Sequence, residues 1–254
     1  MPKSTTPSQS ARSSRRAARR AAALARADVD LRGLLDPQLI SQGPRPLCVP
    51  FTLALGNEAS RTIAGSTPQS LAPEPIWRYC TQRGQTGAGG MLIDDAAVAL
   101  ADEGQPPLQV WPYNASLGIG TENPPNGIGS PPWHTAAVHE LHLAHDGIED
   151  ELEDYLAAAV PIVLIVEVTP EFAYPDGNGY VRLPNLRTAA GDYHAVFCVG
   201  AATDPTRGRH LLIRNSWGSF WGSGGYCWLP TEYLIAFTPY AAIVLPSASP
   251  PATT

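Results

Sequence analysis

Residues 194–217 read HAVFCVGAATDPTRGRHLLIRNSW, with one apolar run on each side of a polar segment that contains proline and glycine. Apolar runs that flank such a break predict a β-hairpin. If Ala201 pairs with Gly208, the register places His194 opposite Asn215, and opposed residues have Cβ atoms about 5 Å apart. An amide oxygen at that distance accepts the imidazole N–H and fixes the ring, which leaves the other ring nitrogen free for chemistry.

A base held in this way needs a nucleophile, and Cys48 is the candidate. It lies where a loop rich in Gly and Pro meets a predicted helix, so helix-terminal N–H groups are expected to favour the thiolate. Pro50 agrees with a helix start, because proline is tolerated in the first helical turn. Gln42 lies on the same loop, and its side-chain N–H groups are expected to point into the same space as an oxyanion donor.

Three segments together resemble the papain-like cysteine peptidases. QGPRPLC at 42–48 resembles the nucleophile segment of that family, YHAV at 193–196 its histidine segment, and NSWGSFWGSGGY at 215–226 its asparagine segment nearly throughout. The order Cys, His, Asn also agrees. The separation of Cys48 and His194, 194 − 48 = 146 residues, falls within the roughly 130–150 residues typical of the family.

The resemblance implies a role for each residue of the candidate site. Cys48 would attack the scissile carbonyl as a thiolate, and His194 would pair with it as an imidazolium and protonate the leaving amine. Asn215 would orient His194, and Trp217 would shield that contact from water. Gln42, with the backbone N–H of Cys48, would hold the oxyanion. The resemblance therefore implies thiol-dependent endopeptidase activity on a peptide or protein substrate, with no cofactor.

The resemblance also implies a substrate-binding cleft. A glycine pair would line it, with a pocket for the second residue before the scissile bond. An apolar side chain is expected in that pocket, whereas the carboxylate of Asp192, if it lines the pocket, would favour a basic one. The implied substrate-binding residues are Gly89, Gly90, Met91, Ile165, Asp192, Tyr193 and Trp217.

The nucleophile segment departs from the family pattern on both sides. Arg45-Pro46-Leu47 stands where the family commonly has a disulfide-forming cysteine, and Val49-Pro50 replaces the usual Trp-Ala after the nucleophile. The stretch before Cys48 is shorter than the inhibitory propeptide of the family, so an intracellular member without a folded prosegment is expected. Two alternatives remain open: a peptide ligase or transferase on the same site, or a catalytically inactive member that binds peptides.

The order of predicted elements indicates an α+β fold with two lobes in a peptidase domain over 28–246. A helical N-terminal lobe, about 46–113, would pack on a β-barrel-like C-terminal lobe, about 134–245, with the active-site cleft between them and the irregular segment 113–133 as the seam. Helices are expected at 48–61, 73–79, 94–103 and 148–159, and strands at 136–144, 161–168, 195–201, 210–214, 225–229 and 241–245.

Charge is distributed unevenly along the chain. The net charge of −6 divides into +7 for residues 1–27 and −13 for the remainder, and an acidic body excludes a nucleic-acid-binding domain. Residues 1–27 and 247–254 are expected to be disordered tails. No apolar run approaches the roughly 20 residues of a membrane helix, so no membrane partner is expected.

The chain is expected to be a monomer. It is expected in the cytoplasm, because no convincing secretory signal is present; a transit or twin-arginine role of the basic tail stays open. The four cysteines have no CxxC spacing, which agrees with a reducing compartment. No metal site is expected at His139, His142 and His145, because strand alternation sends His142 to the opposite face.

Overall fold

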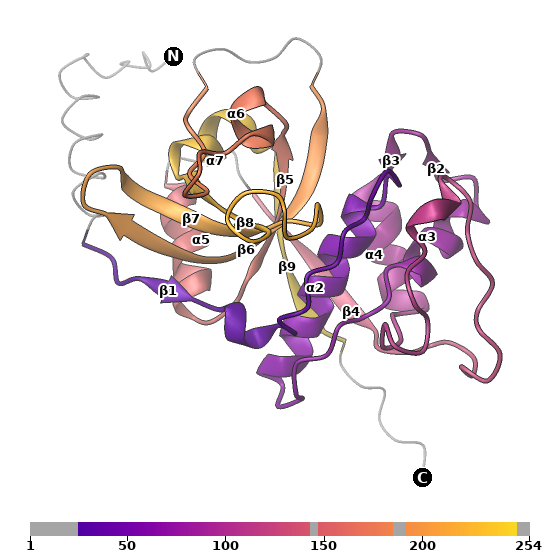
Figure 1. Ribbon diagram of the computed structural model, residues 1–254. Coiled ribbons are helices and arrows are strands. Elements are labelled where there is room, and N and C mark those ends of the chain that lie inside the picture. Colours follow the sequence, from indigo (N-terminus) through magenta and orange to yellow (C-terminus); the bar gives the residue numbers. More distant parts are fainter. Residues whose placement is uncertain (1–24, 143–146, 185–190, 248–254) are drawn as a thin grey trace, which may run out of the picture.

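The computed structural model describes residues 25–142, 147–184 and 191–247. The described part has a helical half beside a seven-stranded antiparallel sheet (Figure 1). The helices are η1 Arg32–Leu34, α2 Cys48–Ile63, α3 Glu74–Thr81, α4 Ile93–Asp102, η2 Ala115–Leu117, α5 Ile148–Ala157, α6 Pro170–Ala173 and α7 Glu232–Phe237. The strands are β1 Val29–Asp30, β2 Thr86–Gly87, β3 Gly90–Met91, β4 Ala136–Leu141, β5 Ile162–Glu167, β6 Tyr193–Asp204, β7 Gly208–Arg214, β8 Tyr226–Pro230 and β9 Tyr240–Pro246.

The predicted α+β class is confirmed, and the four predicted helices and six predicted strands are present with ends displaced by a few residues. The shorter elements η1, η2, α6, α7, β1 and the β2–β3 hairpin were not predicted. The β-barrel-like description is corrected: the sheet order is β4-β9-β5-β6-β7-β8 with β1 on β6, and within the described residues β4 and β8 do not pair to close it.

Helix α2 lies between the two halves of the molecule (Figure 1). It begins at Cys48 after the Gly- and Pro-rich loop, and Pro50 lies in its first turn, where the missing N–H breaks no helical hydrogen bond. Leu53, on its buried face, belongs to one apolar cluster with residues of β6 and β9. Gly56 allows helix and sheet to approach closely, because a Cβ at this position would lie 2.5 Å from Cγ2 of Val244.

Strand β6 is buried on both faces and carries His194 near its start. Because side chains alternate along a strand, Ala195 and Phe197 pack in the cluster that contains α2. Val196 and Cys198 pack in a second cluster with residues of α5 and α7. The sheet therefore lies between α2 on one face and α5 and α7 on the other, and β6 holds the site against the start of α2.

The predicted hairpin of β6 and β7 is present, but its predicted register is wrong. Gly208 pairs with Asp204 and not with Ala201. The connection is shorter than expected, because the Asp204 carboxylate accepts hydrogen bonds from the N–H groups of Thr206 and Arg207, each at 2.8 Å. A side chain thus closes a tight loop that the composition of the segment did not reveal.

Segment 113–133, taken from the sequence as the seam between the lobes, lies on the helical half. Carbonyl oxygens of Asn114, Gly118 and Gly120 accept hydrogen bonds from Arg45. Trp77 of α3 also donates its indole N–H to Gly120, at 3.1 Å. The irregular segment therefore wraps the helices, and the two halves meet along α2.

Most of the two predicted tails, residues 1–24 and 248–254, lies outside the described residues. The last part of the basic segment contacts the β-rich half, because Arg26 forms an ion pair with Asp154 of α5 at 2.7 Å. Across the described residues, no helix combines the length and apolar character needed to span a membrane.

Candidate active site

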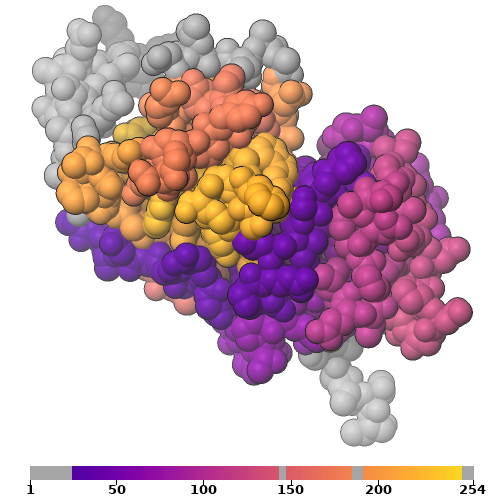
Figure 2. Space-filling model, in the orientation of Figure 1, coloured from indigo at the N-terminus to yellow at the C-terminus, as the bar shows by residue number. Residues whose placement is uncertain are grey.

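Cys48 stands at the first position of α2, half-buried and without a disulfide partner. The loop before it and the start of α2 lie between the helical half and the C-terminal half, which part at a notch in the surface (Figure 2). Backbone N–H groups of Cys48, Val49 and Ala195 face the sulfur and lower the pKa of the thiol, but burial has the larger effect and raises that pKa above its ordinary value. The contact with Ala195 places the sulfur beside the residue that follows His194.

His194 and Asn215 are in contact although they are not cross-strand partners in the sheet. In the sheet, His194 lies opposite Val166 of β5, and Asn215 follows the last residue of β7. The Asn215 side chain nevertheless reaches the ring, with 2.7 Å between Oδ1 and His194 Nε2, and both residues are buried. The structure therefore contains the predicted contact but not the predicted register.

The hydrogen bonds of Asn215 determine which nitrogen of His194 is protonated. The backbone N–H of Ser216 donates to Asn215 Oδ1 at 2.8 Å, which identifies that atom as the amide oxygen. Nε2 must then donate its hydrogen to Oδ1, so in the neutral ring Nδ1 carries the free lone pair. The arrangement presents a base whose accepting nitrogen is the one turned away from Asn215.

An aromatic wall covers the imidazole. The ring of Trp217 lies 4.6 Å from that of His194, centroid to centroid, at an interplanar angle of 34°. The ring centroid of Trp217 also lies 5.8 Å from that of Phe172 of α6 and 5.5 Å from that of Trp221. Burial lowers the pKa of His194 to about 4, although the hydrogen bond with Asn215 acts in the opposite direction. Burial therefore favours the neutral forms of both His194 and Cys48, and not the ion pair that the resemblance implies.

Gln42 is buried and its amide has a fixed orientation. Its Oε1 accepts a hydrogen bond from the Ser216 hydroxyl, and its Nε2 donates to the carbonyl oxygen of Arg45 at 2.8 Å. The backbone N–H of Gln42 also donates to Ser216 at 2.8 Å, so the loop before Cys48 is attached to the segment after Asn215. The second N–H of the Gln42 amide has no acceptor in the part of the chain described and is available to a ligand.

The implied substrate-binding residues lie in different surroundings. Gly90 lies against the nucleophile loop, since a Cβ on it would be 3.4 Å from the carbonyl oxygen of Pro46, while Gly89 is exposed with open space around it. Met91, Ile165 and Cys48 all pack, half-buried, against the same apolar cluster. Asp192 and Tyr193 lie exposed where β6 starts, and Trp217 covers His194. Their roles toward a substrate stay predictions.

Two residues of the site were missed in the sequence. Ser216 ties Asn215 to Gln42, and only the folded loop shows this. Phe172 belongs to the aromatic wall, and the short helix α6 that carries it has a local signal in the sequence. Thr169 followed by Pro170 is a typical helix start, and the Thr169 hydroxyl caps the N–H of Phe172.

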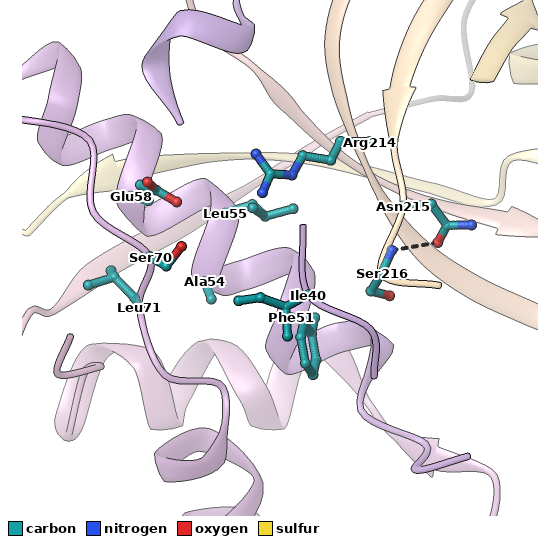
Figure 3. Close-up of a pocket in the computed structure, with 10 residues that line it drawn as sticks. All are labelled: Ile40, Phe51, Ala54, Leu55, Glu58, Ser70, Leu71, Arg214, Asn215 and Ser216. Carbon is teal, nitrogen blue, oxygen red and sulfur yellow. Dashed lines mark hydrogen bonds between the residues drawn. The ribbon is translucent and has the colours of Figure 1, made fainter. Parts of the chain in front are cut away.

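A small cavity of about 30 Å³ lies between α2 and the segment 214–216 (Figure 3). This volume holds one or two water molecules, so the cavity is no peptide-binding pocket. It is lined by Ile40, Phe51, Ala54, Leu55, Glu58, Ser70, Leu71, Arg214, Asn215 and Ser216.

In the described residues, no group of three or more His, Cys, Asp or Glu side chains lies close enough together to bind a metal ion. His139 and His142 are exposed, and His145 lies outside the described residues. The cysteines other than Cys48, which are Cys80, Cys198 and Cys227, are fully buried in the core.

The family follows from comparison with known proteins. Residues 57–235 match the model of the family described as papain family cysteine protease. That match covers more than half of the chain and includes His194 and Asn215, although it begins after Cys48. The chain belongs to the papain family of cysteine proteases, which confirms the resemblance seen in the sequence.

Individual relatives are distant. The chain is 28% identical over 144 residues to a cathepsin L-like proteinase of Fasciola hepatica, covering 56% of this chain and 41% of that protein. It is 28% identical over 196 residues to the oryzain gamma chain of Oryza sativa subsp. japonica, covering 76% and 51%. The chain therefore spans about half the length of the curated relatives it matches.

Solved structures share the fold. Digestive procathepsin L 3 of the Tenebrio molitor larval midgut superposes with a TM-score of 0.70 at 22% identity, over 87% of this chain and 70% of that one. Xylellain, a cysteine protease from Xylella fastidiosa, superposes with a TM-score of 0.66 at 26% identity, over 96% and 91%. The papain-like fold is thus established for this chain.

Proposed function

We propose that this chain is an endopeptidase that hydrolyses peptide bonds through a thioester on Cys48. One observation carries the proposal: the buried contact of 2.7 Å between His194 Nε2 and Asn215 Oδ1, with the N–H of the next residue, Ala195, at the Cys48 sulfur. Because Nε2 donates to Asn215, the lone pair of Nδ1 is left free to accept a proton. Membership of the papain family supports the same conclusion.

The first half of the reaction forms the thioester. As the Cys48 sulfur bonds to the scissile carbonyl carbon, His194 Nδ1 takes the thiol proton, and the carbonyl oxygen becomes negatively charged. The free N–H of Gln42 and the backbone N–H of Cys48 donate to that oxygen. The C–N bond then breaks, and His194 returns the proton to the leaving amine.

The second half releases the acid product. A water molecule gives its proton to His194 as its oxygen attacks the thioester carbon, and the same two N–H donors hold the second oxyanion. The C–S bond breaks and the proton returns to the sulfur. Asn215 keeps Nε2 engaged in both halves, and Trp217 excludes water from that contact.

The test is turnover of a fluorogenic peptide library by the full chain, with Cys48→Ala and His194→Ala as paired variants. Hydrolysis that is lost in both variants supports the proposal. Binding of library peptides without cleavage by the unaltered chain would contradict it and indicate a binding protein. Ligated product after addition of an amine nucleophile, in excess over hydrolysis, would indicate a transferase instead.

We further infer a monomer acting on peptides or proteins in the cytoplasm. All four cysteines are free thiols, which supports a reducing compartment. Sedimentation of the purified chain and fractionation of the source cells test the two parts of this inference. A stable dimer would contradict the first part, and recovery of the chain outside the cytoplasm would contradict the second.

A further inference from the structure

We propose that Arg45 is a positioning residue, which sets the Gln42 amide for the oxyanion. This inference rests on the proposed function. The carbonyl oxygen of Arg45 accepts the hydrogen bond from Gln42 Nε2 at 2.8 Å and another from the backbone N–H of Leu47 at 2.9 Å. The first bond uses one N–H of the amide and thereby directs the second. Movement of the Arg45 backbone would move that donor.

The side chain of Arg45 fixes this backbone in place. It is fully buried, and its guanidinium holds the Glu74 carboxylate through two hydrogen bonds of 2.6 and 3.2 Å. Three further bonds, of 2.7 to 3.1 Å, go to carbonyl oxygens of the loop that follows Tyr113, at Asn114, Gly118 and Gly120. The loop that carries the nucleophile is therefore attached to α3 and to a distant segment through one side chain.

Tyr113 adds a second connection between the guanidinium and Gln42. Its ring lies under Arg45, with 5.1 Å from Cζ to the ring centroid, and its hydroxyl donates to the carbonyl oxygen of Gln42 at 2.7 Å. Arg45 itself accepts from the amide of Gln42, and Tyr113, which contacts Arg45, donates to the carbonyl oxygen of Gln42. Together with the Ser216 hydroxyl, which donates to Gln42 Oε1, these bonds leave the Gln42 amide little freedom to rotate.

A buried ion pair is by itself weak evidence for a stabilising role. Desolvating a charged pair is expensive, and buried pairs are often replaced by apolar residues without loss of stability. The described residues contain a second buried pair of the same kind, in which Arg209 holds Glu153 at 2.7 and 2.9 Å. That pair joins β7 to α5 and has no bond to the loop before Cys48. It provides a matched control for the effect of breaking a buried arginine–glutamate pair.

Arg45→Lys is the informative substitution, because it keeps the charge. The planar guanidinium serves acceptors in several fixed directions, whereas an ammonium has three donors on one atom and cannot reach all of them. We expect the loop to shift by a fraction of an ångström, which is sufficient to weaken catalysis where a donor must meet a developing charge. Arg209→Lys should destabilise the fold to a similar degree without this shift.

The experiment measures two reactions of Cys48 in the full chain. Peptide hydrolysis needs the oxyanion donors, but alkylation by iodoacetamide attacks a saturated carbon and forms no oxyanion. For Arg45→Lys we expect kcat to fall by roughly tenfold to a hundredfold, by comparison with the 10²–10³ lost with a whole donor. The alkylation rate should stay within about twofold, and Arg209→Lys should change neither rate.

A double-mutant cycle tests whether Arg45 acts through Gln42. In a Gln42→Ala background, Arg45→Lys should lower kcat by less than about twofold, because the donor that it positions is gone. Additive losses, equal losses of hydrolysis and alkylation, or equal effects of the two lysine variants would each overturn the inference. If Arg45→Lys does not fold, Glu74→Gln, which removes the charged partner of Arg45, takes its place in the same cycle with the same expected results. An unaltered chain without hydrolysis would overturn the proposed function instead.

Discussion

Replacing His194 with Gln is expected to remove a pH-dependent part of the folding stability. In the folded chain, burial lowers the pKa of His194 to about 4, against an ordinary value of 6.5. Between these values the unfolded chain binds a proton at this position and the folded chain does not, so stability is lost as the pH falls from 6.5 to 4. At 1.36 kcal/mol per pKa unit, the full loss is about 3 kcal/mol.

The assay is urea unfolding of the two proteins at intervals between pH 4 and pH 8. The difference in unfolding free energy, unaltered chain minus His194→Gln, should decrease by about 3 kcal/mol from pH 7 to pH 4, and other titrating groups cancel in this difference. A difference that is flat, or that increases toward low pH, would refute the reasoning. It would show that His194 carries a proton in the folded state, as in a thiolate–imidazolium pair with Cys48. Loss of that behaviour in Cys48→Ala would then identify the partner.

Three further substitutions have defined outcomes. Gln42→Ala should lower kcat by about 10²-fold while Cys48 still reacts with iodoacetamide, since one oxyanion donor is removed. Asn215→Ala should lower kcat by at least about tenfold with little change in KM, because the imidazole loses its orienting acceptor; an unchanged kcat would contradict this role. Gly56→Ala should destabilise the chain by about 1–3 kcal/mol in thermal unfolding, since its Cβ would lie 2.5 Å from a Val244 methyl, whereas Gly33→Ala, with nothing within 4 Å, should not.

The sequence predicted those parts of the fold that depend on local chemistry. Helix α2 was placed correctly at its start, because the Gly- and Pro-rich loop and Pro50 mark a helix terminus. The predicted register of the β6–β7 hairpin was wrong. The actual register depends on the Asp204 side chain, which closes the turn, and on a bulge between Cys198 and Gly200. Neither feature has a signal in apolar patterning.

The candidate site divides in the same way. Cys48, His194 and Asn215 could be predicted because their residue types and spacing resemble a known family. Ser216 and Arg45 could not, because each acts through partners that only the tertiary structure supplies: the Gln42 amide for Ser216, and carbonyl oxygens of a distant loop for Arg45. Buried polar networks of this kind depend on the three-dimensional arrangement of their members, which the spacing of residues along the sequence does not indicate.

The most direct test of the proposed thioester is its capture. The full chain is mixed with the nitrophenyl ester of an N-acylated amino acid, quenched in acid within milliseconds to seconds, and its intact mass and digested peptides are measured. The account predicts one acyl group per chain, bound to the sulfur of Cys48. An acyl group on another residue, or none despite release of nitrophenol, would contradict the account.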